Sequence, residues 1–499
     1  MKNSTCMIFP ATFVRRIFFE KRNKNNRKLN LLRFVFFSAA LMLGCTRQAS
    51  ENNRSSENKQ SALEESPVRN LPLLMPDNFD SLLLVYWRQE EGVPDPKNPL
   101  LEPAMPWDAG GVMAHGTVLH DPIDGLWKAW QVSTPAEPEL KGINGKHESL
   151  RRLTYLESKD GVSWYRPELD LVKWPGYGHT NILFDMNSGG IAQYASVLVD
   201  PENKEWPYEM YLIRTTFLGP DSTRVGHLPA PKGEKRGIYK YRSKDGKLWE
   251  LISGPLLNLG RGGDVAYFYR QPDGTYVVYC KQYSKEPGDR VIPFDNNAQQ
   301  LVRKIGRSTS ADGTTWEPVK IIFERDWRDA GFAQYLELCP VQVNKGFVGI
   351  LTYYDASNKT MSLQMAASRD GINWWRPDRR PALPNPPLGD YGGGMMWQMH
   401  QPIIENGKMY VYYAGAQGLH GEILDSRMQP RLEVGNESVI GTRIGTLPFY
   451  SALCRASWEV DRLYALAPSV GGSTIGRAVT KPESSGKGQL MVNVLVLEG

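Results

Sequence analysis

Two acidic residues stand at matching positions in two strand-like segments, where a pair of carboxyl groups could do acid–base chemistry. Asp264 lies ten residues before Gly274, and Glu337 lies nine residues before Gly346; each glycine marks a turn. Glu337 is flanked by apolar residues, a costly place for a carboxylate unless it is paired or faces a cavity. Two carboxyl groups in different environments can hold opposite protonation states, so that one donates a proton while the other accepts.

The strand-like segment 116–132 lacks an acid at the corresponding position, which falls near His115. Asp108 lies upstream and could reach the same end of that strand. Asp121 lies at the far end, where a turn begins, and is better explained as a turn residue. The predicted catalytic acids are Asp108, Asp264 and Glu337.

Five further side chains could contact a bound ligand. Histidine suits a hydroxyl or leaving group, tryptophan suits the face of a ring, and arginine suits an acidic group or a neighbouring carboxylate. Isolated histidines and tryptophans in β-structure more often serve packing, and that alternative stays open. The predicted ligand-binding residues are His115, His179, Arg261, Trp397 and His400.

The scaffold that positions these residues contains a repeated motif, S-x-D-G-x-x-W. Asp-Gly is typical of a tight hairpin turn, because glycine adopts positive φ and aspartate accepts hydrogen bonds from nearby amides. We expect the tryptophan to return to the core and pack against the neighbouring unit, so the motif is structural. The four copies are 158–164, 243–249, 310–316 and 368–374.

Each copy of the motif follows two more strand-like runs joined by a turn, as in 265–282 and 339–354. A fifth unit, 402–415, is followed by a strand-like run without the motif. Five units of about four antiparallel strands predict an all-β fold, a five-bladed β-propeller. Two stacked β-sandwiches are the alternative, but the regular long period favours radial repetition. The inner strands of a propeller converge on a central cavity, where the candidate residues would meet.

The positive charge of the chain is concentrated in its first residues. The 499 residues hold 59 basic and 54 acidic side chains, a net charge of +5, but nine basic residues and one acid lie in 1–44. The other 455 residues hold 50 basic and 53 acidic side chains, a net charge of −3. A nearly neutral body argues against a nucleic-acid partner. A hydrophobic content of 41% and a charged content of 23% exclude wholesale disorder.

Residues 1–44 are predicted to be a signal peptide, because a basic stretch precedes the apolar run 31–43. The run is too short to span a bilayer comfortably. It ends in Leu41-Met42-Leu43-Gly44-Cys45, which resembles the lipobox of bacterial lipoproteins and implies lipidation of Cys45. A plain signal peptide is the alternative. Residues 45–75 read as a polar tether, and we expect an exported protein, secreted or held in the cell envelope, that meets the membrane only through this anchor.

Cys280, Cys339 and Cys454 lie far apart in apolar strand-like runs. Their odd number argues against a complete disulfide framework, so buried free thiols are the prediction. Neither a Cys-x-x-Cys nor a His-Glu-x-x-His pattern supports a metal site. We therefore expect no cofactor; a structural Ca²⁺ in the central channel stays open, although no acid-rich loop requires it.

Several of these stretches resemble the five-bladed propellers of the invertase and arabinanase superfamily, related to glycoside hydrolase families 32 and 43. The resemblance begins near Pro96 and is greatest to family-32-like secreted bacterial proteins. Asp264 after its glycine pair is similar to the family's Arg-Asp-Pro acid, and Glu337 to its Glu-Cys-Pro acid, with Leu338 inserted. The supporting stretches are 98–100, 106–108, 158–167, 261–265, 335–340 and 475–497.

The resemblance implies an enzyme that cleaves glycosidic bonds in an environmental poly- or oligosaccharide. It makes Glu337 the general acid, Asp264 the acid that orients the sugar, and Asp108 the base or nucleophile. The missing acid of the first unit keeps open a carbohydrate-binding propeller without hydrolysis and an inverting phosphorylase of the related single-acid type. The tail resembles the start of the β-sandwich that follows such propellers, so we assign 76–450 to the propeller and 451–499 to a partial sandwich.

Overall fold

The computed structural model of the protein is almost entirely β-structure. The helical elements of the described part are two 3₁₀ turns, η1 (Pro76–Asn78) and η2 (Val460–Arg462). No helix among the described residues is long and apolar enough to cross a membrane. The described residues are 6–9, 75–112, 115–134, 140–141, 147–148, 152–184, 191–216, 237–257, 259, 265–284, 302–343, 345–420, 431–434, 437–440, 451–468 and 475–481.

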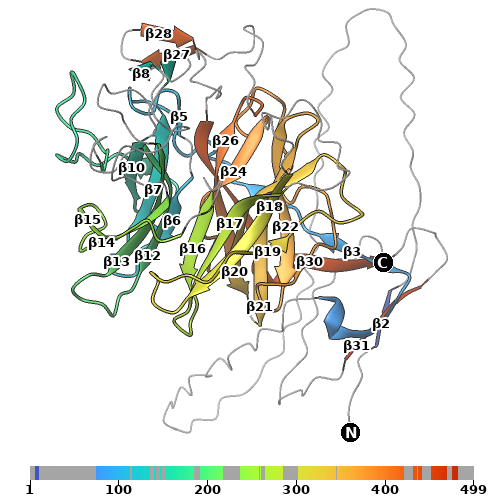
Figure 1. Ribbon diagram of the computed structural model, residues 1–499. Coiled ribbons are helices and arrows are strands. Elements are labelled where there is room, and N and C mark those ends of the chain that lie inside the picture. Colours follow the sequence, from blue (N-terminus) through green and yellow to red (C-terminus); the bar gives the residue numbers. More distant parts are fainter. Residues whose placement is uncertain are drawn as a thin grey trace, which may run out of the picture.

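Five antiparallel sheets follow one another along the chain as the blades of a propeller (Figure 1). This arrangement confirms the predicted all-β, five-bladed fold. Blade 1 contains β6 (Thr117–His120), β7 (Trp127–Thr134), β10 (Arg152–Ser158) and β11 (Trp164–Tyr165), with β5 (Gly111–Val112) also paired to β7. Blade 2 contains β12 (Ile191–Val199), β13 (Tyr208–Thr216), β14 (Gly237–Ser243) and β15 (Trp249–Ser253). Blade 3 contains β16 (Ala266–Arg270), β17 (Tyr276–Ser284), β18 (Val302–Ser310) and β19 (Lys320–Phe323), and blade 4 contains β20 (Ala333–Val343), β21 (Gly346–Asp355), β22 (Thr360–Ser368) and β23 (Trp374–Trp375).

The fifth blade combines strands from both ends of the propeller. Arg455 on its third strand forms an ion pair with Asp95, beside its outermost strand, at 2.5 Å. We predicted a propeller over 76–450; it instead runs from β4 to β29, because residues 451–459 are the third strand of this blade. The strands of blade 5 are β24 (Met395–Gln398) with β25 (Ile403–Glu405), β26 (Lys408–Ala416), β29 (Ser451–Glu459) and β4 (Val93–Pro94).

Five further strands pair segments that precede the propeller with segments that follow it. β3 (Val85–Gln89) pairs with β30 (Tyr464–Pro468), and β31 (Gly476–Thr480) lies between β2 (Phe79–Leu83) and β1 (Cys6–Phe9). The partial sandwich over 451–499 stays a prediction, since 482–499 lie outside the described residues. Cys45 and the tether up to residue 74 also lie outside them, and β1 is the described part of the predicted signal peptide. Two short pairs complete the list: β8 (Leu140–Lys141) with β9 (His147–Glu148), and β27 (Arg431–Val434) with β28 (Glu437–Ile440).

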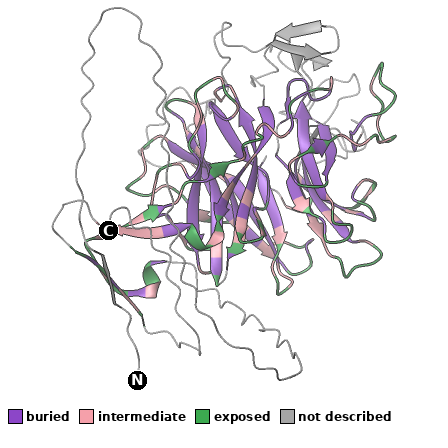
Figure 2. Cartoon of the chain, turned by 180° about the vertical axis from the view of Figure 1, so that it is seen from behind, coloured by how far each residue is buried: buried purple, intermediate pink, exposed green. Residues whose placement is uncertain are grey.

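Hydrogen bonds join neighbouring blades at or next to their inner strands; the bond between blades 5 and 4 reaches the second strand of blade 4. Figure 2 shows that the blade strands are mostly buried and that exposed residues gather at the turns. The three thiols predicted to be buried and free are so. The interblade bonds are Thr117 Oγ1 to Ala195 O (2.9 Å), Phe268 N to Ser196 Oγ (3.1 Å), His400 N to Gly116 O (2.7 Å) and Gln398 Nε2 to Ile350 O (2.8 Å).

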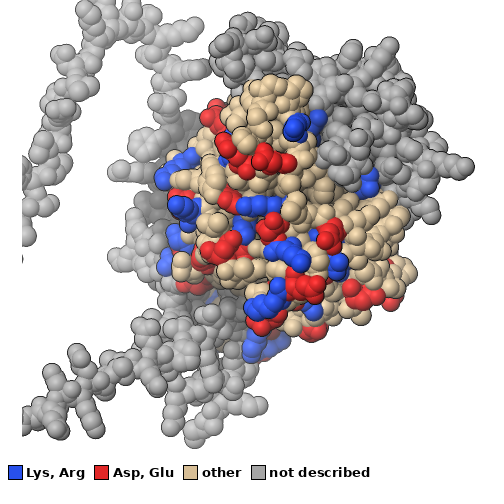
Figure 3. Space-filling view, turned by 90° about the vertical axis from the view of Figure 1, so that its left-hand side faces the viewer, with Lys and Arg blue, Asp and Glu red and all other residues tan. Residues whose placement is uncertain are grey.

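Charged side chains at the surface are mixed in sign. On the face drawn in Figure 3, lysine and arginine lie among aspartate and glutamate, without a large area of one sign among the described atoms. Exposed ion pairs include Arg242 with Glu250 at 3.1 Å and Arg270 with Asp200 at 3.0 Å. Such a surface is unlike the basic stripe that binds a phosphate backbone.

The four Asp-Gly motifs form the predicted tight turns between the third and fourth strands of blades 1 to 4. In the first copy Asp160 Oδ1 accepts the amides of Ser163 (2.7 Å) and Val162 (2.8 Å), and Ser158 Oγ accepts the amide of Gly161 (2.9 Å). These amides, that of Ser163 first, hold the pKa of Asp160 well below its usual range. The four turn glycines have φ between +70° and +74°, which favours glycine. The motif is therefore structural, as predicted.

Each turn also bonds to the blade before it. The carbonyl oxygen of the turn glycine accepts a hydrogen bond from an aromatic side chain on the second strand of that blade. The motif tryptophans pack edge-on against the same aromatic rings, at centroid distances of 5.9 to 6.4 Å. Blade 5 lacks the turn, and the matching register position of blade 4 holds Ile350, opposite Met365. The four bonds are Tyr412 Oη to Gly161 O (2.6 Å), Trp130 Nε1 to Gly246 O (2.7 Å), Tyr211 Oη to Gly313 O (3.0 Å) and Tyr279 Oη to Gly371 O (2.5 Å).

Two glycines with nearly equal φ separate the effect of backbone conformation from that of packing. Gly246 (φ +74°) would place a Cβ 2.9 Å from Trp130 Cζ2, whereas a Cβ on Gly125 (φ +73°) would meet nothing within 4 Å. We expect Gly125→Ala to lower the free energy of unfolding by about 1 kcal/mol. Gly246→Ala should lower it by about 2–4 kcal/mol, because the turn must also move away from the indole. Urea unfolding of both variants checks this, and equal losses would contradict the role of the interblade contact.

Candidate active site

The inner strands of the five blades bring polar and aromatic side chains together on the propeller axis. His115 lies two residues before β6 of blade 1, and Glu337 lies on β20 of blade 4, yet the two are in hydrogen-bond contact. Tyr194 lies on β12 of blade 2, Tyr267 lies on β16 of blade 3, and His400 follows β24 of blade 5. The rings of both tyrosines lie next to the His400 imidazole. All five side chains are buried. The site therefore takes one residue from each blade.

Glu337 brings a carboxylate into this group. Its Oε1 lies 3.2 Å from His115 Nδ1, and its Oε2 accepts a hydrogen bond from Thr352 Oγ1 at 2.8 Å. The side chains of Glu337 and His115 are 2% and 3% exposed. A shift of register between Tyr335 and Glu337 marks a β-bulge, a feature that re-aims side chains. The carboxylate is thus paired, as burial among apolar residues requires.

The imidazole of His115 packs against two aromatic rings. Its centroid lies 4.2 Å from that of Tyr194 and 5.2 Å from that of Trp397, and its Nε2 lies 3.4 Å from the Tyr194 hydroxyl. Tyr194 has a φ of +54° and lies in an irregular part of β12. A left-handed conformation costs a tyrosine on the order of 1 kcal/mol or more, and such strain gathers at functional sites. The fold therefore accepts strain to hold Tyr194 against His115.

His400 lies beside this pair in its neutral form. Its Nδ1 lies 2.9 Å from Ser196 Oγ, which accepts the amide of Phe268 at 3.1 Å. Burial, with a smaller effect of the neighbouring His115, lowers the pKa of His400 to about 3. The Nε2 atom has no hydrogen-bond partner in the described part of the chain.

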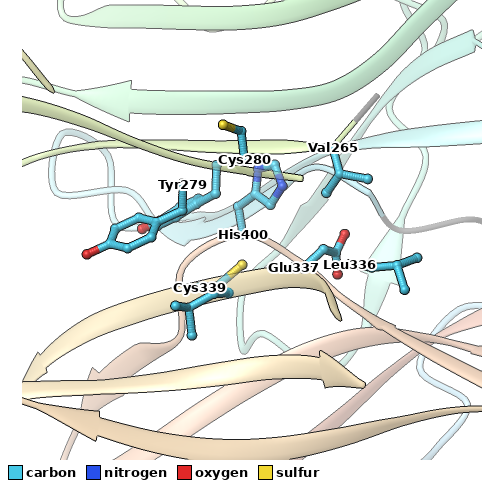
Figure 4. A pocket seen from close by; sticks show the side chains of 9 residues that line it. Val265, Tyr279, Cys280, Leu336, Glu337, Cys339 and His400 are labelled. Atoms are coloured by element: carbon cyan, nitrogen blue, oxygen red, sulfur yellow. The ribbon is translucent and has the colours of Figure 1, made fainter. Parts of the chain in front are cut away.

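A narrow cavity with no room for a water molecule lies beside Glu337 and His400 (Figure 4). Figure 4 shows the Glu337 carboxyl and the His400 imidazole at the same cavity, with Val265 nearby. The thiols of Cys280 and Cys339 also line it; burial raises both pKa values, that of Cys280 to about 12, so neither is a thiolate. The space is too tight for a sugar ring. The bond to be cleaved in a substrate would therefore have to approach Glu337 and His400 from the edge of the cavity.

The structure gives Asp108 partners that stabilise a loop. Its Oδ1 accepts the amides of Ala104 (2.8 Å) and Met105 (2.7 Å), and its Oδ2 accepts a bond from Arg166 Nε (2.8 Å). Burial raises the pKa of this carboxyl, while Arg166 and the amides act in the opposite direction. No hydrogen bond or ion pair among the described residues joins Asp108 to Glu337. Its role as base or nucleophile stays a prediction that these contacts do not favour.

Asp108→Asn separates the two roles of this residue. Asparagine keeps an oxygen for the two amides but leaves Arg166 without its charge partner, so we expect the free energy of unfolding to fall by about 2 kcal/mol. Turnover per folded molecule should change by less than about threefold, whereas loss of a catalytic base costs about 10²-fold or more. Unfolding curves and initial rates on any substrate of the protein measure both. A loss above 10²-fold in a folded variant would restore Asp108 as the base.

The other predicted residues are distributed as follows. Trp397 and His400 lie at the axis, as described above. Asp264 and Arg261 lie outside the described residues. His179 is exposed on the loop after β11, and its Nδ1 lies 2.8 Å from Asp170. Asp121 is a turn residue, since its carboxylate accepts the amide of Ile123 at 2.9 Å.

We did not predict Tyr194, Ser196 or Thr352. Counting outward from the turn between Val343 and Gly346 places Thr352 opposite Glu337, so the hairpin register could have found it. Tyr194 and Ser196 lie where β12 departs from regular pairing, and strand alternation cannot place them.

No family model matches the chain, and no curated protein matches it. Solved structures do match. A putative glycosidase from Bacteroides thetaiotaomicron is 14% identical, with 74% of this chain and 96% of that chain covered and a TM-score of 0.42. A β-1,2-mannobiose phosphorylase from Listeria innocua is 13% identical, with 74% and 98% covered and a TM-score of 0.46. A family 117 glycoside hydrolase produced by the marine bacterium Zobellia galactanivorans is 10% identical, with 76% and 91% covered and a TM-score of 0.41.

Proposed function

We propose that this protein cleaves glycosidic bonds in an environmental poly- or oligosaccharide by acid–base catalysis on the propeller axis. The observation that carries the proposal is the buried contact of 3.2 Å between Glu337 and His115, at the convergence of the inner strands. A carboxylate and an imidazole in contact can hold and transfer a proton near neutral pH. The resemblance of 158–167 and 335–340 to glycoside hydrolase propellers supports the substrate class.

Phosphate-dependent cleavage is the second candidate. Asp108 is engaged with Arg166 and two amides, which leaves Glu337 as the carboxyl contacting the axial cluster among the described residues. A buried cation also lies close to the start of β20, since Arg303 Nη1 donates to Gln334 Oε1 at 2.6 Å. A single acid with a nearby cation is the combination that suits an enzyme in which phosphate attacks the sugar.

A screen of glycans with and without phosphate tests the proposal. We expect the protein and the exposed control Glu317→Gln to release sugar, and Glu337→Gln to lose about 10²–10⁴-fold in kcat/KM. Full activity of a folded Glu337→Gln would remove Glu337 from the chemistry. Sugar phosphate formed only with phosphate present would favour phosphorolysis. Binding without turnover would favour the carbohydrate-binding propeller and overturn the proposal.

We also propose that the chain is exported and anchored through Cys45. The net charge of +8 on residues 1–44, followed by the apolar run 31–43 and the lipobox-like end, supports this. Expression in a bacterial host with labelled fatty acid provides the test: the protein should carry label, and Cys45→Ser should not. Label on both would overturn this assignment, and label on neither would leave a plain signal peptide.

A further inference from the structure

Two hydrogen-bonding groups contact the carboxyl group of Glu337, one at each oxygen. Thr352 Oγ1 accepts a long contact of 3.5 Å from Gln398 Nε2 and donates to Glu337 Oε2 at 2.8 Å. The second oxygen faces His115 Nδ1 at 3.2 Å. A carboxylate can accept hydrogen bonds from both groups, from the Thr352 hydroxyl and from an Nδ1–H of His115. The arrangement thus suits Glu337 as the acceptor in its contact with His115.

His115 is placed to hold a proton that can be transferred to a substrate. With Nδ1–H directed at Glu337, the atom that exchanges a proton is Nε2, on the opposite edge of the ring, beside the Tyr194 hydroxyl at 3.4 Å. The Glu337 carboxylate beside Nδ1 favours the charged imidazolium, whereas the burial of the ring opposes it. The ring cannot turn without breaking the Glu337 contact, so the direction of Nε2 is set by the fold.

We propose that His115 Nε2 is the acid that protonates the leaving group, and that Glu337 is a positioning residue acting through His115. This assignment rests on the proposed function. It exchanges the roles that the sequence resemblance implied, because there Glu337 was the general acid. It also explains why the first blade has a histidine where the related enzymes carry an acid.

The step balances with groups already named. The imidazolium gives its Nε2 proton to the glycosidic oxygen as the bond from that oxygen to the anomeric carbon breaks, and the bonding electrons stay with the oxygen. Water, or phosphate in the phosphorolytic case, forms the new bond to the anomeric carbon; water releases one proton to solvent. Neutral His115, still bonded to Glu337 through Nδ1–H, takes up a proton from solvent for the next cycle. No oxidant or metal enters this balance.

Three titratable groups among the described residues lie next to His115. Glu337 on β20 favours the imidazolium, Tyr194 on β12 contacts Nε2, and neutral His400 after β24 adds no charge at neutral pH. Activity should therefore fall at alkaline pH, as the imidazolium loses its proton. Removing the Glu337 charge should move this alkaline limb of kcat/KM to lower pH.

The pH profiles of two variants distinguish the acid from its positioning residue. His115→Gln should lose the alkaline limb and about 10²–10⁴-fold in kcat/KM on a natural glycan. It should lose far less on a dinitrophenyl glycoside, whose leaving group departs without a proton. Glu337→Gln should keep the limb but move it to lower pH. If Glu337 is the acid, Glu337→Gln loses the limb and His115→Gln moves it to higher pH, which would overturn the assignment.

Nuclear magnetic resonance of histidine-labelled protein tests the pairing without turnover. We expect the His115 signals, assigned by their loss in His115→Gln, to show the Nδ1–H tautomer above the titration midpoint, and that midpoint to fall in Glu337→Gln. Thr352→Val should leave the tautomer unchanged. An Nε2–H tautomer, or a midpoint unaffected by Glu337→Gln, would overturn the pairing. A correct pairing in a protein that turns over no glycan would instead reject the proposed function.

Discussion

His400→Gln is expected to flatten the pH dependence of stability between pH 6.5 and pH 4. Burial lowers the pKa of His400 from 6.5 to about 3 in the folded protein. Below pH 6.5 the unfolded chain takes up a proton at this residue, whereas the folded side chain stays neutral. The unfolded state thus binds more protons in this window, and the free energy of unfolding falls as the pH falls. At about 1.4 kcal/mol per pH unit, the loss reaches about 3 kcal/mol at pH 4.

Chemical denaturation at half-unit steps from pH 4 to pH 7 measures this contribution. The difference in unfolding free energy between the protein and His400→Gln should change by about 3 kcal/mol across the window. The exposed His179→Gln serves as the control and should follow the unsubstituted protein. A constant difference between the protein and His400→Gln would mean that His400 is protonated in the folded state.

Arg455→Met is expected to destabilise the protein by about 3–5 kcal/mol, because it leaves a largely buried carboxylate without its charge partner. The side chains of Arg455 and Asp95 are 12% and 11% exposed, and their ion pair of 2.5 Å ties β29 to the segment after β4. The same guanidinium also donates to Tyr412 Oη at 3.2 Å, and that hydroxyl bonds to Gly161 of blade 1. One side chain thus links the two ends of the propeller and the neighbouring blade.

Lys408→Met provides a matched control within the same blade. Lys408 pairs with Glu459 between β26 and β29 at 3.4 Å, but the two side chains are 44% and 51% exposed. Such a surface pair contributes about 0–1 kcal/mol. Urea unfolding should separate the two variants, and hydrogen exchange of the β29 amides should accelerate in Arg455→Met alone. Similar losses of stability in both variants would show that the closure of the propeller between β29 and β4 does not depend on the Arg455–Asp95 ion pair.

The blades were predictable because the chemistry of the repeat is local. In 158–164 the aspartate and glycine form the turn from their own side chain and φ, whatever the rest of the chain does. The limits of the propeller were not predictable in this way. Two residues, Val93 and Pro94, supply the last strand of blade 5, and a run that short carries no periodic signal.

The site was predictable in part. Glu337 and His115 could be singled out by residue type and position along their strands, but their contact joins residues 222 positions apart and depends on the bulge in β20. The partners of Asp108 show the opposite case. An acid beside a predicted strand suggested catalysis, whereas two local amides and Arg166 hold it in a loop. Sequence gives the residue type, and only tertiary structure supplies the partner.

The shared fifth blade also has a consequence for how the protein is made. Asp95 is translated 360 residues before its partner Arg455, so the strand that seals the ring leaves the ribosome long before the strand that receives it. A nascent chain stalled before residue 451 would carry four blades and an unsealed β26, an edge open to pairing with another chain. The pairing of β4 with β29, which closes the propeller, can therefore form only at the end of translation. A circular permutant with β4 placed after β29 would make the blade contiguous and shorten this exposure.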